Sequence, residues 1–290
     1  MTVTFDDLPS VRLRESNEEL AGMTARLLGH LDKHKIPAIG FVNEGKLYLN
    51  GELDDERVDL LRMWCQAGYE LGNHTYSHLD LHRTTLDDFQ KDLIHGEQVT
   101  RPLLENCGMT LRYFRHPLLH TGRELETKQA LEEFLAEHGY RVAPVTIDNS
   151  EWIFAKAYFD ARQEQDAARM KQIAEAYIQY MNAKISYFEE QSLRLFGREI
   201  PQVLLLHANH LNADHFGILA KRIQARGYDF VSLEEVLSDE AYQSADTYTG
   251  PSGIAWIHRW AITAGQPREF FGDEPGTPQW VLDAAGMEYE

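Results

Sequence analysis

Two short stretches of the chain carry residues that together suit a catalytic metal ion. In GNHTYSHLD, His74 and His78 are four residues apart, a spacing that can place two imidazoles on one side of a turn. Asp6 and Asp7 directly follow the run Val3-Thr4-Phe5. Two neutral imidazoles and one carboxylate leave coordination positions open for water and substrate, and the second aspartate would be free to act as a base. Zinc (Zn²⁺) is the first expectation, while imidazole and carboxylate also suit iron, cobalt (Co²⁺) and nickel (Ni²⁺).

Neither pair is specific by itself. The chain has 13 histidines, and the pairs His30/His34, His78/His82 and His116/His120 share the same spacing. An aspartate pair at the end of a strand is often only the start of a turn, because Asp bonds readily to nearby backbone groups. What distinguishes His74 and His78 is their place at the end of a predicted strand, with an aspartate supplied from the end of another.

Short apolar runs alternate with longer helical patterns, which is typical of a parallel sheet or barrel with helices outside. The predicted strands are Thr2–Phe5, Pro37–Val42, Tyr69–Gly72, Arg112–Phe114, Arg141–Ile147, Val203–Leu206 and Asp229–Val231. About seven strands favour one α/β barrel over an open sheet. In such a barrel, functional residues lie at the carboxyl ends of the strands.

Polar residues capable of acid–base or metal chemistry do follow the apolar runs. They are Asp6, Asp7, His74, Arg115, Asp148, Glu151 and His207. Turn formation alone does not explain so many such residues at the ends of five predicted strands. We therefore expect them to meet at one end of the barrel.

Two segments stand apart from this alternation. Residues 156–197 are rich in Ala, Gln, Glu and Lys and contain no Pro, so they predict a helical insertion before the sixth strand, either covering core or acting as a lid over the substrate. The C-terminal tail, about residues 240–290, has a loop-like pattern. Its Trp256, Trp260 and Trp280 either pin the tail to the barrel or form a platform for sugar rings; ordinary packing is the favoured interpretation.

Composition and charge narrow the classes of protein to which the chain could belong. A formal net charge of −18 and the lack of a basic face argue against nucleic acid as a partner. No apolar run reaches the roughly 20 residues needed to span a membrane. No linker or repeat divides the chain, so we expect a single domain over residues 1–290. Cys65 and Cys107 leave open one disulfide or none. The chain carries no recognisable signal peptide, which fits either a cytoplasmic protein or an exported one that has been trimmed.

The motifs TFDD, HTYSH, RHP, SEW and LLLH, in this order, resemble the polysaccharide deacetylases of carbohydrate esterase family four, also known as the NodB-homology domain. The resemblance runs from Thr4 to about Leu237 and includes the stretch ARGYDFVSLEEVL. It implies a distorted (β/α)₇ barrel that uses one divalent metal ion to remove acetyl groups from sugars. Members of this family commonly act outside the cytoplasm, so the resemblance favours a secreted or periplasmic location.

The resemblance also implies a role for each matching residue. Asp6 would be the general base, Asp7, His74 and His78 the metal ligands, and His207 the general acid. Arg115 would orient Asp6, and the backbone N–H of Leu118 would contribute to the oxyanion hole. Trp152 would form a wall of the acetyl pocket, with Leu205 packed beside it.

The chain departs from the family pattern at three places. The family usually has an aspartate before the tryptophan to orient the acidic histidine; here Glu151 stands there, so either Glu151 or Asp148 takes that role. Leu118 replaces a tyrosine, which keeps the backbone donor and loses an aromatic contact. Leu8-Pro9 replaces a glycine after the aspartates, which makes the adjoining loop stiffer. These departures make the usual long polymers less certain substrates.

The first functional hypothesis is therefore a metal-dependent deacetylase of N-acetyl or O-acetyl carbohydrate of the chitin, peptidoglycan or xylan type. The alternative within the same fold is a hydrolase of a small non-carbohydrate amide or ester. A non-catalytic glycan-binding protein is a third hypothesis. A two-histidine, one-carboxylate oxygenase fits the ligand set but has no need of the second aspartate or of His207. The sugar, the metal and the oligomeric state stay open.

Overall fold

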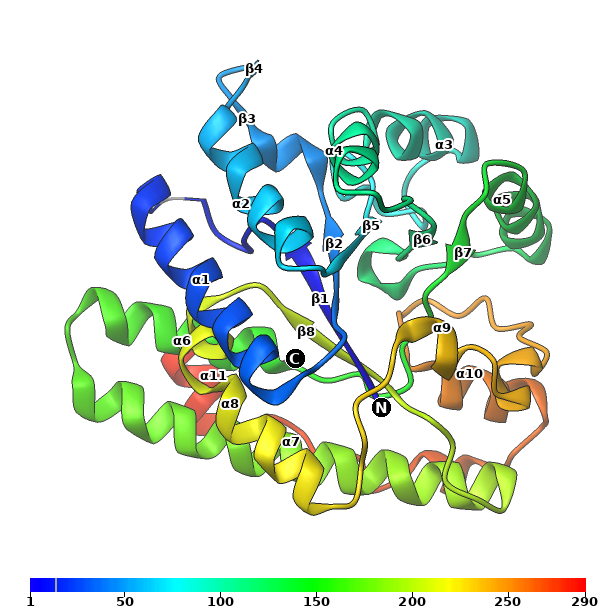
Figure 1. The fold of residues 1–290 in the computed structure, drawn as a ribbon. Coiled ribbons are helices and arrows are strands. Elements are labelled where there is room, and N and C mark those ends of the chain that lie inside the picture. Colours follow the sequence, from blue (N-terminus) through cyan, green and yellow to red (C-terminus); the bar gives the residue numbers. More distant parts are fainter. Residues whose placement is uncertain (14) are drawn as a thin grey trace.

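The computed structural model describes residues 1–13 and 15–290, built around a curled, six-stranded parallel sheet (Figure 1). In spatial order the strands are β7 (Arg141–Val142), β6 (Tyr113–Phe114), β5 (Glu70–Asn73), β2 (Ile39–Val42), β1 (Thr2–Leu8) and β8 (Val203–His207). After β7 the chain returns toward β8, where Ile147 forms a parallel bridge with Leu204. This curled sheet with its surrounding helices is the distorted (β/α)₇ barrel that the sequence predicts.

The central strand β1 is buried along nearly its whole length, as expected for a parallel strand covered on both faces. Phe5 packs against Trp64 and Phe216, with ring centroids 5.8 and 5.5 Å away. The sequence pattern predicts that this strand ends at Phe5, before the two aspartates. In the structure it continues through them to the fully buried Leu8. It can do so because cationic side chains lie against both carboxylates.

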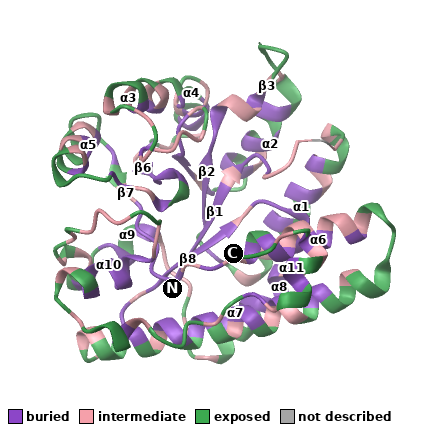
Figure 2. Ribbon diagram, turned by 180° about the vertical axis from the view of Figure 1, so that it is seen from behind, coloured by how far each residue is buried: buried purple, intermediate pink, exposed green. Residues whose placement is uncertain are grey.

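Helices surround the sheet, with their buried sides against it and their exposed sides outward (Figure 2). They are α1 (Asn17–His34), α2 (Asp55–Gln66), α3 (Leu86–His95), α4 (Thr100–Asn106), α5 (Leu125–Glu137), α6 (Glu151–Gln163), α7 (Ala167–Phe196), α8 (His210–Ala225), α9 (Leu233–Val236), α10 (Trp256–Thr263) and α11 (Gln279–Ala285). Four short 3₁₀ turns also occur among the described residues: η1 (Glu44–Leu47), η2 (Pro117–Leu119), η3 (Glu240–Gln243) and η4 (Arg268–Phe271). No helix within the described ranges is long and apolar enough to cross a membrane.

Two of the predicted strands need correction. Asp229–Val231 is not a strand. Among the described residues its backbone bonds only to Met1, whose amino group donates to Asp229 O and whose carbonyl accepts from the N–H of Val231, and two bonds to one residue do not make a ladder. The strand predicted over Arg141–Ile147 ends at Val142. Pro144 has no N–H to offer, so the ladder stops there. The hairpin of β3 (Tyr48–Leu49) and β4 (Glu52–Leu53) has no counterpart among the predicted elements.

The helical insertion is confirmed, although its first helix, α6, begins at Glu151 rather than near residue 156. The 30-residue α7 then crosses beneath the barrel (Figure 1). The tail is loop-rich, as predicted, and contains the helices α10 and α11 as well. Trp256 and Trp260 are buried, which favours the packing interpretation for both, whereas Trp280 is partly exposed.

A disulfide joins Cys65 in α2 to Cys107 after α4. It settles, for this structure, the pairing that the sequence left open. The single-domain organisation over residues 1–290 stays a prediction.

Candidate active site

The carboxyl ends of the strands open into a cavity of about 680 Å³. The predicted site residues that line it are Asp6, Asp7, His74, His78, Leu118, Asp148, Trp152, Leu205 and His207. Arg115 and Glu151 are fully buried. Arg115 contacts Asp6, and Glu151 contacts His207. The structure therefore brings together all of the residues that the sequence singled out, from β1, β5, β6, β8 and the start of α6.

Asp7, His74 and His78 each offer one ligand atom, and the three atoms lie within 4.8 Å of one another. His74 Nδ1 is 2.8 Å from the backbone oxygen of Arg115. Since a carbonyl only accepts, Nδ1 donates its proton there, and Nε2 keeps the lone pair that a metal ion needs. His78 Nε2 lies 3.9 Å from Asp7 Oδ1. Both Asp7 and His78 have left-handed backbone conformations, which concentrate at functional sites.

The charge states of these three residues suit a divalent cation. Burial alone would raise the pKa of Asp7, but the ammonium of Lys46 and the nearby histidines hold it well below the usual range. Burial, together with the His78 ring, lowers the pKa of His74 well below its usual value, and burial also lowers the pKa of His78. One carboxylate and two neutral imidazoles are therefore present at neutral pH, which is the protonation state that metal binding requires. The donor set fits zinc, cobalt or nickel.

Asp6 is held by a fully buried arginine. Arg115 Nη1 lies 3.3 Å from Asp6 Oδ2, while Nη2 donates to Thr4 Oγ1 at 3.0 Å and Nε to the backbone oxygen of Ala143 at 2.8 Å. Asp6 Oδ1 is buried and has no hydrogen-bond partner among the described residues. Burial raises the pKa of Asp6 to about 6, although Arg115 and His207 act in the opposite direction. Asp6 is thus a carboxylate at neutral pH with one oxygen free to accept a proton.

His207 is paired with Glu151, whose Oε2 lies 2.9 Å from His207 Nδ1. The other oxygen of Glu151 accepts from Asn209 Nδ2 at 2.5 Å and from Asn212 Nδ2 at 2.6 Å, so its orientation is fixed. Burial alone would lower the pKa of His207, but the hydrogen bond and charge of Glu151, with the two nearby aspartates, raise it to about 9. His207 is therefore protonated at neutral pH and able to donate.

Of the two candidates for orienting His207, only Glu151 contacts it. Asp148 Oδ1 accepts from the backbone N–H of Asn149 at 2.8 Å, and the side chain lines the cavity with no hydrogen bond to His207 in the described part of the chain. Burial raises the pKa of Asp148 to about 6. The longer glutamate reaches the histidine because it is the first residue of α6.

The remaining predicted residues line the cavity wall. Leu118 lies in η2 with a left-handed backbone (φ 56°), and within the described ranges its N–H makes no backbone hydrogen bond. Its side chain is half exposed, as is that of Trp152, whereas Leu205 is buried. A free backbone donor and two apolar walls match what an acetyl pocket with an oxyanion hole requires.

Several site residues escaped sequence reasoning. Lys46 Nζ lies 3.0 Å from Asp7 Oδ1 and donates to the Asp7 backbone oxygen at 3.1 Å. It follows β2 in the 3₁₀ turn η1, and only its position after an apolar run hinted at a role. The tail contributes residues 251–253 and Glu290 to the cavity lining. A Cβ on Gly253 would overlap the backbone oxygen of Leu118, so a glycine is needed for this close approach.

Replacing Lys46 with Met is expected to tighten zinc binding roughly tenfold, because its ammonium would repel a divalent ion held by the same carboxylate. Isothermal titration of the metal-free protein with zinc measures this affinity. Lys91→Met is the matched control, since Lys91 is exposed and pairs with Asp87 on the surface of α3. Weaker zinc binding by the Lys46 variant would contradict the repulsion and would mean that Lys46 holds Asp7 in place.

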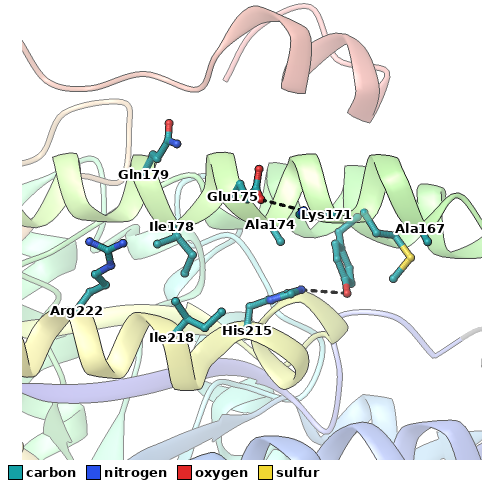
Figure 3. Close-up of a pocket in the computed structure, with 11 residues that line it drawn as sticks. Ala167, Lys171, Ala174, Glu175, Ile178, Gln179, His215, Ile218 and Arg222 are labelled. Atoms are coloured by element: carbon teal, nitrogen blue, oxygen red, sulfur yellow. Dashed lines mark hydrogen bonds and ion pairs between the residues drawn. The ribbon is translucent and has the colours of Figure 1, made fainter.

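A second cavity, of about 550 Å³, lies between α7 and α8 (Figure 3). Its walls are mostly apolar, with Ile178 and Ile218 facing each other across it. His215 is partnered there by Tyr158, with 3.2 Å between Nε2 and the hydroxyl. None of the predicted site residues lines this cavity, so the chemistry belongs to the cavity at the strand ends.

Comparison with known proteins agrees with this architecture. Among solved structures, a family 4 carbohydrate esterase from Streptomyces lividans, in complex with acetate, aligns with a TM-score of 0.50 at 18% identity, over 81% of this chain and 94% of that one. A family 4 acetyl xylan esterase from Clostridium thermocellum, in complex with a cobalt ion, aligns with a TM-score of 0.51 at 21% identity, over 82% and 89%. A mutant of a family 4 pseudoenzyme aligns with a TM-score of 0.51 at 16% identity, over 82% of this chain and 67% of that one. The fold is thus that of the family 4 carbohydrate esterases.

Residues 1–143 match the model of the polysaccharide deacetylase family. A peptidoglycan-N-acetylglucosamine deacetylase from Bacillus cereus is 24% identical over 152 residues, which are 52% of this chain and 46% of that protein. The aligned region therefore spans about half the length of this relative. Residues 1–143 thus match the polysaccharide deacetylase family, and the fold of the chain agrees with that match.

Proposed function

We propose that the protein is a metal-dependent hydrolase that removes acetyl groups from N-acetylated or O-acetylated carbohydrate. The observation that carries this proposal is the convergence, in one cavity, of a buried carboxylate, a set of three metal ligands and a protonated histidine. The family match and the peptidoglycan deacetylase relative support the reaction class.

In this proposal Asp7, His74 and His78 hold the metal ion. When bound, such an ion supplies Lewis acidity, which lowers the pKa of a bound water and polarises a carbonyl group.

The residues around the ligands have complementary tasks. Asp6 accepts the proton of the attacking water through its free oxygen, while Arg115 keeps the carboxylate in place. The N–H of Leu118 donates to the carbonyl oxygen as negative charge develops on it. His207 donates a proton to the departing amine or alcohol, and Glu151 fixes the ring so that Nε2 carries that proton.

One observation favours the second candidate function, the hydrolysis of a small non-carbohydrate amide or ester. Residues 251–253 and Glu290 of the tail add a wall to the catalytic cavity, and a walled cavity suits a short substrate better than the middle of a long polymer. The third hypothesis, glycan binding without catalysis, gives no reason for an acid and a base beside three metal ligands in one cavity.

Acetate release tests the proposal. The protein is incubated with chitooligosaccharides, acetylated xylan and peptidoglycan, and also with small acetyl esters and cyclic amides, with and without a chelator. We expect release from at least one carbohydrate, its loss on chelation, and its return with zinc or cobalt. Release only from the small compounds would favour the second function. Glycan binding that survives chelation, with no acetate released from any substrate, would favour the third.

A further inference from the structure

A cluster of three side chains beside the catalytic cavity has no task in the proposed reaction. Asp80, His82 and His120 each place a ligand atom within 4.8 Å of the others. His120 lines the cavity together with the metal ligands and His207, so the cluster adjoins the place where substrate binds.

The tautomer of His120 is fixed by Asp80. Its Nδ1 lies 2.6 Å from Asp80 Oδ1, and because a carboxylate accepts, Nδ1 carries the proton. Asp80 is itself held in place, since Oδ1 also accepts from the backbone N–H of His82 at 2.8 Å. In the neutral ring, Nε2 of His120 is then an acceptor. It has no hydrogen-bond partner in the described part of the chain, and it is not among the buried unpartnered atoms, so it is open to the cavity.

His82 fixes the plane of this ring. The two imidazoles are stacked, with centroids 3.8 Å apart and planes 5° from parallel. The backbone N–H of His82 is held by Asp80, and its ring, whose nitrogens are buried, is oriented by stacking against His120.

This geometry does not suit a second metal ion. The lone pair of an imidazole nitrogen lies in the plane of its ring, and two nearly parallel planes 3.8 Å apart do not meet at one ion. One ring would have to turn out of the stack before both could bind. A single acceptor held rigidly and facing a cavity is the arrangement of a hydrogen-bonding subsite.

We propose that His120, positioned by Asp80 and His82, accepts a hydrogen bond from a hydroxyl group of the carbohydrate whose acetyl group is removed. The inference rests on the proposed function and adds to it a residue that selects hydroxylated substrates over bare acetyl compounds. On this wall, Leu118 offers an apolar side chain at its half-exposed position, whereas His120, two residues later, offers a polar one.

The test compares two substrates, a chitooligosaccharide and 4-nitrophenyl acetate, which has no hydroxyl group. For His120→Ala, we expect the ratio of kcat/KM for the sugar to that for the ester to fall about tenfold, mainly through KM for the sugar. His120→Gln should recover part of this ratio, because its amide oxygen can accept near the position of Nε2. His82→Phe, which keeps a stacked ring, should lower this ratio less than His82→Ala does. His138→Ala, at an exposed position after α5, is the control.

Each other outcome has a defined meaning. An equal loss on both substrates would overturn the subsite, since it would mean that His120 only supports the fold or the catalytic groups. Loss of one bound metal ion per chain in His120→Ala and His82→Ala, measured by elemental analysis, would overturn it in favour of a second metal site. If the unaltered protein cleaves the ester and releases no acetate from any sugar, the proposed function itself fails, and the inference with it.

Discussion

If Asp6 is the general base of the proposed reaction, we expect Asp6→Asn to lower kcat for acetate release about 10²–10⁴-fold, the usual contribution of such a group. Asparagine has nearly the same shape and can still accept from Arg115. It lacks the negative charge needed to take a proton, and Asp6 Oδ1 is the buried oxygen left free for that task. The measurement is the steady-state rate on whichever carbohydrate the protein deacetylates.

Two controls separate this effect from damage to the site. Arg115 keeps its bonds to Thr4 and Ala143 in the variant, so we expect the thermal unfolding curve to stay cooperative. Metal content should also remain at the wild-type level in Asp6→Asn and fall in Asp7→Asn, because only Asp7 belongs to the ligand set. A rate within about twofold of wild type in Asp6→Asn would remove Asp6 from the mechanism.

The position of the site was predictable because it depends on local patterns. The apolar runs that end at Asp7, His74 and His207 mark buried strands, and parallel strands bring their carboxyl ends together, so these three residues were expected to approach one another. The same reasoning placed the insertion between the fifth and sixth main strands. It needs only the order of the runs and no knowledge of distant contacts.

Other features depend on contacts that no local pattern contains. Lys46 reaches Asp7 across 39 positions of sequence, and the residues 251–253 reach the cavity from the far end of the chain. The choice between Glu151 and Asp148 was equally out of reach, because it depends on which of them the start of α6 turns toward His207. Asp229–Val231 had the composition of a strand but met only Met1, and a strand exists only where a partner continues.

The tail also shows why a loop-like sequence pattern says little about function. Its glycines and prolines predict irregular backbone, and much of it is irregular, yet Trp256 and Trp260 anchor it so that residues 251–253 border the catalytic cavity. Arg259 assists by donating to the backbone oxygen of Leu119 and to Thr121 Oγ1, which lie in and just after η2. The tail therefore helps to hold the wall that carries Leu118 and His120.

The pH dependence of the reaction tests the Glu151–His207 pair. The base must be deprotonated, so the rate rises as pH increases through the pKa of Asp6, about 6. The acid must be protonated, so the rate falls as pH increases through the pKa of His207, about 9. The wild-type profile is then a bell with its plateau between these two values.

Replacing Glu151 with Gln removes the charge that raises the pKa of His207 and keeps a side chain of similar size. If that pKa returns to about 6.5, the rate at pH 8.5 falls about 50–100-fold, because about 1% of His207 then remains protonated, while the rate at pH 6 changes about twofold or less. Asp148→Asn is the matched control and should leave the alkaline limb near pH 9, since Asp148 makes no hydrogen bond to His207 in the described part of the chain. An alkaline limb that moves in Asp148→Asn and stays in place in Glu151→Gln would assign the orienting role to Asp148. This chain would then differ from the family pattern in where the orienting carboxylate stands in the sequence, and the extra methylene group of Glu151 would have no part in it.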